Sequence, residues 1–148
     1  MGAGLTTVAV DTTVSEAALQ VYATALTSVM VSPVARPEDL DYLLADRRYT
    51  GRLIGPGSGV GPDTRARVLA MLHTGRATVL HADALSAFKD DPPSLFRAIK
   101  GACVLTPHEG EFSRLFAGVV EPRSDKLARA RAAARASGAV VVLKAAIP

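Results

Sequence analysis

The sequence has 148 residues, of which 49% are hydrophobic and 21% charged, with a net charge of +3, as is typical of one globular domain. No apolar run approaches the roughly 18–20 residues of a membrane span, one cysteine excludes an internal disulfide, and scattered cations with 5% aromatics disfavour nucleic-acid binding. No basic segment precedes an apolar one, as a signal peptide requires, so we expect a cytoplasmic protein that binds neither a membrane nor nucleic acid.

Short runs rich in aliphatic residues alternate along the chain with segments of helical spacing. The runs, which we predict to be strands, are Leu5–Val10, Val29–Val31, Arg52–Ile54, Thr78–His81, Ala102–Leu105 and Val140–Leu143. Apolar residues recur at helical spacing within Leu19–Leu26, Leu40–Leu44, Arg65–Leu72 and Phe112–Phe116, and an alanine-rich helix is expected over Ser124–Ser137. The pattern predicts an α/β fold, with a mostly parallel sheet flanked by helices on both faces.

The segment Gly55–Gly61 follows one predicted strand and precedes a helix, and it has four glycines in seven residues. Glycine permits positive φ and close approach of a ligand to the backbone, and free N–H groups at a helix start attract anions. The spacing matches neither a P-loop nor the common dinucleotide fingerprint. Because a tight turn needs fewer glycines, we interpret the segment as a ligand-binding loop.

His81 and Asp83 follow the next predicted strand. Asp83 could cap the helix that comes after it, and His81 could be a satisfied residue of the sheet, so the sequence assigns neither a chemical role. Cys103 lies in an apolar run without a base nearby in sequence. It is expected to be a small buried hydrophobe rather than a nucleophile.

The segment "LTPHEGEF", residues 105–112, contains the residues of a helix start together with others that a helix start does not need. Thr106 fits the N-cap position, Pro107 the first helical position and Glu109 the third. Together they predict a capping box with proline at its preferred place.

His108, Gly110 and Glu111 are not explained by that cap. Glycine inside the first turns costs about 0.5–1 kcal/mol relative to alanine, and His108 and Glu111 share one face of the predicted helix. We therefore expect His108 and Glu111 to contact a ligand. A zinc site of the H-E-x-x-H type would need a histidine at Phe112, so no metal site is predicted.

Five segments, taken in order, resemble the ADP/ATP-dependent NAD(P)H-hydrate dehydratases, a carbohydrate-kinase-like family within the ribokinase-like superfold. These segments are Gly2–Ala9, Ile54–Gly59, Ala82–Leu85, Leu105–Phe112 and Val141–Lys144. The resemblance covers nearly the whole chain, and "TPHEGEF" is its most specific part.

The resemblance implies a lyase that removes water from hydrated NADH or NADPH with ADP or ATP, accompanied by Mg²⁺. The ring hydroxyl would be phosphorylated and phosphate then eliminated, a chemistry that depends on positioning and charge stabilisation. By resemblance, Gly57, Gly59 and His108, with Glu111 beside them, would bind the hydrated dinucleotide, and Lys144 would bind the nucleotide. A homo-oligomer is also implied.

Some family features do not occur in residues 1–148. The family carries a G-T-G-D motif, whose amides form an anion hole and whose aspartate is the presumed base, and also a helix and a glycine-rich segment before "GAGL". We therefore expect residues 1–148 to be a single ribokinase-like domain that lacks both regions. The base is then expected outside these residues.

Other positions depart from the family pattern. His81 stands where an aspartate is common, and Ala145 follows Lys144 where a glycine is usual. Ile147–Pro148 do not fit the usual nucleotide-contacting pattern.

Two alternative functions remain open from the sequence. One is a small-molecule kinase of the same superfold that acts on a sugar or a vitamin precursor, although "TPHEGEF" argues against it. The other is a non-catalytic fragment or binding module, which the missing anion hole and base favour.

Overall fold

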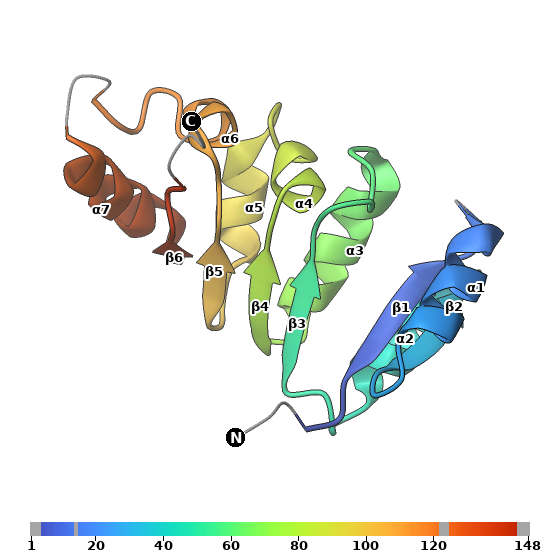
Figure 1. Ribbon diagram of the computed structural model, residues 1–148. Helices are drawn as coiled ribbons and strands as arrows, with labels where there is room; N and C mark the ends of the chain where they lie inside the picture. The colour runs from blue at the N-terminus through green and yellow to red at the C-terminus, as the bar shows by residue number, and fades with distance from the viewer. Residues whose placement is uncertain (1–3, 14, 122–124, 145–148) are drawn as a thin grey trace. The chain divides into compact units, whose positions relative to one another are not determined.

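A computed structural model describes residues 4–13, 15–121 and 125–144. The chain divides into two compact units, Met1–Thr50 and Gly51–Pro148 (Figure 1). Some positions discussed above lie outside the described residues: Gly2, Ala3, Ser124, Ala145, Ile147 and Pro148. The prediction that residues 1–148 form one domain stays a prediction.

The first unit is a β-α-β-α arrangement around a parallel pair of strands. Its elements are β1 (Thr7–Asp11), α1 (Glu16–Ala25), β2 (Met30–Val34) and α2 (Pro37–Ala45). Thr7 pairs with Met30 and Asp11 with Val34. Among the described residues of this unit, the buried hydrophobic side chains are Val10 and Val34, so its core is small.

The second unit holds a four-stranded parallel sheet in the order β3-β4-β5-β6. Its elements are β3 (Gly51–Ile54), α3 (Pro62–His73), β4 (Ala77–Leu80), α4 (Asp83–Ser86), α5 (Pro92–Ala98), β5 (Cys103–Leu105), α6 (Glu109–Leu115), α7 (Lys126–Ser137) and β6 (Val140–Val141). Because all four strands run the same way, the segments that follow them leave the sheet at one edge, where open α/β sheets bind ligands.

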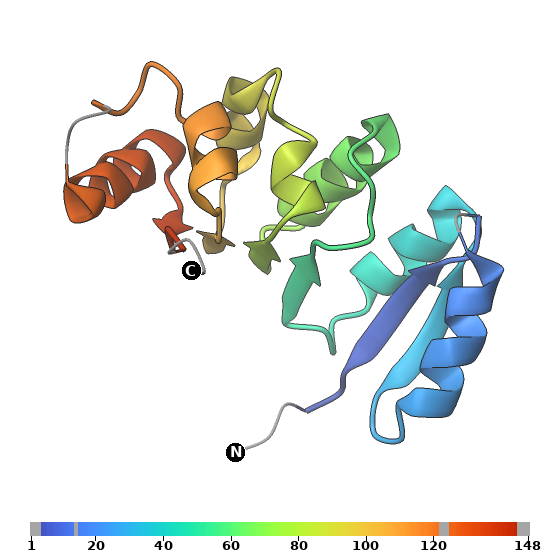
Figure 2. The ribbon, with the colours of Figure 1, turned by 45° about the horizontal axis from the view of Figure 1, so that its top comes forward.

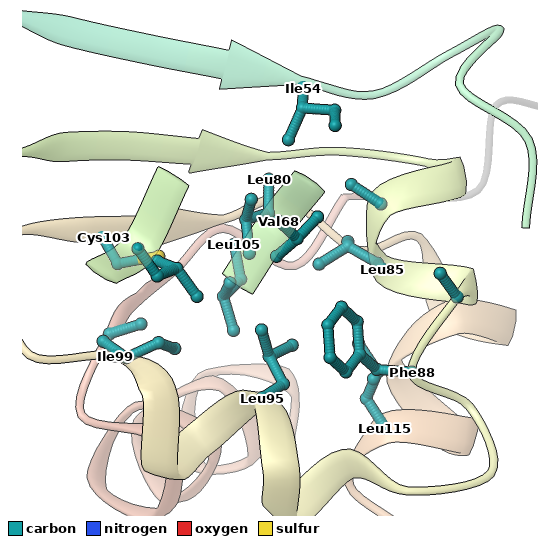
Figure 3. Packing of buried hydrophobic residues seen from close by; sticks show 14 of the residues in the cluster. Ile54, Val68, Leu80, Leu85, Phe88, Leu95, Ile99, Cys103, Leu105 and Leu115 are labelled. Atoms are coloured by element: carbon teal, nitrogen blue, oxygen red, sulfur yellow. The ribbon is translucent and has the colours of Figure 1, made fainter. Parts of the chain in front are cut away.

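The core of this unit lies between the sheet and its helices. Ile54, Leu80 and Leu105 pair in register across three strands and point toward the helices (Figure 3). The helices and their connections contribute Val68, Leu72, Leu85, Phe88, Leu95, Phe112, Leu115, Phe116 and Ala133. Full burial of one such side chain contributes about 1.5–3 kcal/mol, so this cluster is the main source of stability in the unit.

The opposite face of the same sheet carries a second aliphatic row. Leu53, Val79, Val104 and Val140 pair in register, and the outer two, Leu53 and Val140, are 66% and 61% exposed. Within the described part of this unit, the helices pack on one face of the sheet (Figures 1 and 2). The predicted α/β class, with parallel strands flanked by helices, is confirmed. The helices were predicted to cover both faces of the sheet, and in the described part of this unit they cover one face.

Every predicted strand and helix has a counterpart, with bounds that differ by a few residues at the ends. The last helix ends at Gly138, whose φ of 71° is the left-handed conformation expected there. Among the described residues, no helix combines the length and the apolar character that crossing a membrane would require.

Candidate functional site

The structure brings together the segments that follow β3, β4, β5 and β6. The His81 N–H donates to the Ile54 carbonyl at 3.1 Å, which ties the end of β4 to the start of Gly55–Gly61, called the glycine loop below. The Lys144 N–H donates to the Pro107 carbonyl at 2.9 Å, which ties the end of β6 to the segment after β5. All the segments singled out in this unit therefore meet at the carboxyl edge of the sheet.

Asp83 holds the glycine loop in place. Its Oδ2 accepts hydrogen bonds from the N–H groups of Gly57, at 3.0 Å, and Gly59, at 3.1 Å. Both glycines have positive φ, 82° and 75°, a conformation that favours glycine. These two amides are therefore engaged by the protein's own carboxylate, whereas the sequence suggested loop amides free to attract an anion.

The suggestion that Asp83 caps the next helix is wrong. Asp83 is the first residue of α4, and Ala82 occupies the N-cap position. Ala82 has φ 47° and ψ −116°, and it is the one described residue other than glycine with positive φ. Such a conformation costs about 1–3 kcal/mol, and here it turns the chain so that the Asp83 carboxylate faces the loop.

The helix after β5 begins two residues later than predicted. Its N-cap is His108 rather than Thr106: the His108 Nδ1 accepts from the N–H of Gly110 at 3.0 Å and of Glu111 at 3.4 Å. The Glu111 carboxylate accepts from the His108 N–H at 2.9 Å, which completes the capping box. The predicted box from Thr106 to Glu109 is therefore wrong, and the pair left unexplained by it is the real cap.

Contacts within the sheet explain this shift. The Thr106 Oγ1 lies 2.9 Å from His81 Nδ1, so the hydroxyl is bonded to the neighbouring strand end and does not cap. Pairing between the β5 and β6 segments continues as far as the bond between Lys144 and Pro107, which keeps the chain extended. The contact with Thr106 also gives the His81 ring a hydrogen-bond partner, which is the structural role that the sequence left open for His81.

Gly110 also has a structural reason. A Cβ at this position would lie 2.9 Å from Cε1 and 3.3 Å from Nδ1 of His108. Any larger residue would thus push the capping imidazole away from the first turn. The cost of a glycine in this helix is offset by the cap, so Gly110 is not by itself a sign of a ligand.

The two residues of the cap differ in accessibility. The His108 side chain is 51% exposed, whereas that of Glu111 is 5% exposed, and Glu111 Oε1 lies 3.4 Å from His108 Nε2. Of the two, His108 is the one that a ligand can reach. Lys144 is partly buried at the end of the described residues, on the same edge of the sheet.

Glu109 makes a contact that the sequence gave no means to predict. Its carboxylate pairs with Arg129 of α7 at 2.7 Å, and the Arg129 guanidinium lies over the Phe112 ring at 4.8 Å. The partners are 20 positions apart, and no local spacing indicates the pair. The contact joins α6 to α7 at the first residue of α6, directly after His108.

The sequence prediction that Cys103 is a buried hydrophobe rather than a nucleophile is confirmed. Cys103 is buried, and burial raises the pKa of its thiol to about 11, so the thiolate nucleophile is disfavoured. His73 is exposed at the end of α3. Within the described ranges, no group of three or more histidine, cysteine, aspartate or glutamate side chains could hold a metal ion.

Comparison with known proteins gives one consistent family. The sequence model of a family described as NAD(P)H-hydrate dehydratase matches residues 1–147. Relatives described as bifunctional NAD(P)H-hydrate repair enzymes include one from Thermosynechococcus vestitus, 39% identical over 63% of this chain and 18% of its own length. Those from Mycobacterium tuberculosis and Pyrobaculum aerophilum are 37% and 38% identical over 66% of this chain, and 20% and 19% of their lengths. The chain thus spans about a fifth of these relatives.

We predict that Asp83→Ala will loosen the glycine loop. Hydrogen bonds to a charged group contribute about 1.5–3 kcal/mol, so amide exchange at Gly57 and Gly59 should accelerate by roughly tenfold or more. The measurement is amide hydrogen exchange by NMR. Asp63→Ala, in the exposed first turn of α3, is the control and should leave both rates unchanged. Equal rates in Asp83→Ala and the unmodified chain would contradict the proposed support of the loop.

We predict a strong coupling between Gly110 and His108 in stability. Gly110→Ala alone should lower the free energy of unfolding by about 1 kcal/mol, because it displaces a capping side chain. In the His108→Ala background the same change should be neutral or stabilising, since alanine is the better helix former by about 1 kcal/mol. Urea denaturation of the four variants in the cycle measures the coupling. The same effect in both backgrounds would refute the steric explanation.

Proposed function

The chain belongs to the NAD(P)H-hydrate dehydratase family, and on that premise we propose that it acts in the nucleotide-dependent dehydration of hydrated NADH or NADPH. One observation carries the proposal for this chain. The glycine loop, the exposed imidazole of His108 and the Lys144 segment converge at the carboxyl edge of one parallel sheet. The relatives described as bifunctional NAD(P)H-hydrate repair enzymes support the same substrate.

The proposed reaction has two steps. The hydroxyl oxygen of the hydrated ring attacks the terminal phosphorus of ADP or ATP, and the bond from that phosphorus to the nucleotide breaks. The ring then loses a proton and the phosphorylated oxygen leaves as phosphate, so the ring double bond is restored. The balance is hydrate plus ATP giving reduced dinucleotide, ADP and phosphate, with AMP in place of ADP when ADP is the donor. This makes the enzyme a lyase that depends on positioning more than on covalent catalysis.

His108 is the residue proposed to donate to the substrate. Because its Nδ1 accepts backbone N–H bonds, the neutral ring carries its proton on Nε2. The Nε2 lies 3.4 Å from Glu111 Oε1, and we propose that its N–H donates to an oxygen of the dinucleotide when the substrate is bound. Glu111, proposed earlier as a direct contact, accepts a hydrogen bond from the His108 backbone N–H and lies beside the ring, so its carboxylate is not free.

Gly57 and Gly59 are proposed to contribute space rather than donors. A Cβ at either position would meet no protein atom within 4 Å, so the surface above the loop is open. Side chains there would occupy the volume over the loop, where a dinucleotide could approach the backbone closely. Asp83, which shapes the loop from below, is a positioning residue in this proposal.

Lys144 is proposed to contact the nucleotide phosphates. Mg²⁺ is held in phosphoryl-transfer sites by one or two carboxylates together with substrate phosphates, so it would arrive with ADP or ATP. No described residue is assigned as the catalytic base, which the family resemblance places in a G-T-G-D segment. The choice of nucleotide, the homo-oligomer and the cytoplasmic location stay predictions.

The proposed activity is tested by incubating the chain with hydrated NADH and ATP or ADP. Recovery of NADH absorbance is the expected result, either from residues 1–148 or from a version extended to include a G-T-G-D segment. Recovery only in the extended version would favour the reading of residues 1–148 as an incomplete domain. Phosphorylation of a sugar or vitamin precursor instead, without recovery of NADH, would replace this function by the kinase alternative.

We predict that His108→Asn will separate binding from folding. Asparagine is a good N-cap, so the free energy of unfolding should change by less than about 1 kcal/mol. The variant lacks the imidazole Nε2–H, so its Kd for NADPH should rise by about tenfold, the effect of one lost hydrogen bond of roughly 1.4 kcal/mol. Fluorescence titration gives the Kd and urea denaturation gives the stability. Unchanged affinity would remove His108 from the substrate site.

A further inference from the structure

A hollow with two cationic walls lies beside the glycine loop. It has a volume of about 240 Å³ and is lined by Val60, Ser86, Lys89 and Arg114. Val60 belongs to the loop, Ser86 ends α4, Lys89 follows it and Arg114 comes from α6. The helices α4 and α6 lie side by side in both ribbon views (Figures 1 and 2).

The two cations of this hollow are not paired with a carboxylate in the described part of the protein. Lys89 and Arg114 are exposed, and neither forms an ion pair with a described residue. Asp90, which directly follows Lys89, is exposed and makes no ion pair with it, and three other nearby acidic groups are engaged elsewhere. The Asp83 carboxylate binds the glycine loop, that of Glu109 binds Arg129, and that of Glu111 binds His108.

The hollow also adjoins the proposed substrate site. Arg114 Nη1 lies 3.8 Å from the Cβ position at Gly110, so its guanidinium reaches back to the turn that His108 caps. On the other side, Val60 directly follows Gly59, whose amide is held by Asp83. A ligand that lies over the loop and contacts His108 would therefore lie next to the hollow that Lys89 and Arg114 line.

We propose that this hollow binds a phosphate group, which under the proposed function is a phosphate of the dinucleotide substrate. Arginine offers a planar fork of donors that matches phosphate oxygens, lysine adds a compact positive charge, and the Ser86 hydroxyl can donate a further hydrogen bond. Val60 supplies an apolar wall for the attached sugar or base. The phosphate is either the 2′-phosphate that distinguishes NADPH or the diphosphate common to NADH and NADPH.

The test uses Lys89→Gln and Arg114→Gln in the full 148-residue chain. Each should raise the Kd for inorganic pyrophosphate, measured by calorimetry, by about fivefold, in keeping with a partly exposed charge-assisted contact. Titration with NADPH and NADH by fluorescence identifies the phosphate. A rise for NADPH alone indicates the 2′-phosphate, and a similar rise for both indicates the diphosphate. Arg97→Gln, at an exposed position of α5, is the charge-matched control and should change none of these constants.

The outcomes separate this site from the proposed function. Undetectable pyrophosphate binding by the unmodified chain, or binding that both variants retain, overturns the phosphate site. Pyrophosphate binding that depends on Lys89 and Arg114, without binding of either dinucleotide, supports the phosphate site and removes the proposed substrate. Thermal unfolding of each variant verifies that neither substitution alters the fold, as is expected for exposed side chains.

Discussion

The candidate site depends on the pair of hydrogen bonds from Gly57 and Gly59 to one oxygen of Asp83. These bonds join the segment after β3 to the start of α4, and they fix the loop over which the proposed ligand would lie. The strained backbone of Ala82 turns the carboxylate toward the loop. Phosphate-binding loops use such amides for the ligand, whereas this loop uses the Gly57 and Gly59 amides internally, so in the proposed site nearby side chains would meet the charge of a ligand.

The start of α6 illustrates how a tertiary contact decides between two local patterns. The segment can be capped from Thr106 to Glu109 or from His108 to Glu111, and both have the spacing of a capping box. The bond from Thr106 to His81 and the pairing beyond β5 exclude the first arrangement. As a result, one imidazole serves both as the helix cap and as the proposed contact to substrate.

The sequence was sufficient for the elements and insufficient for the contacts between them. Alternating aliphatic runs and helical spacing predicted the parallel α/β order, and Gly138 and Cys103 behave as their residue types suggest. The support of the glycine loop by Asp83 joins residues 26 and 24 positions apart, and no periodicity reports such a pair. The hollow at Lys89 and Arg114 was missed for the same reason, because its walls come from three separate segments.

The reactivity of the single cysteine can report the opening rate of one of the two units. Cys103 is buried beneath the helices of the second unit, and its raised thiol pKa keeps it unreactive while that core is closed. A thiol reagent will therefore modify the chain at the rate at which this core opens, and it will be blind to opening of residues 4–13 and 15–50. Labelling at Cys103 can thus report how a bound dinucleotide or nucleotide slows the opening of the unit that carries the site, without any engineered probe.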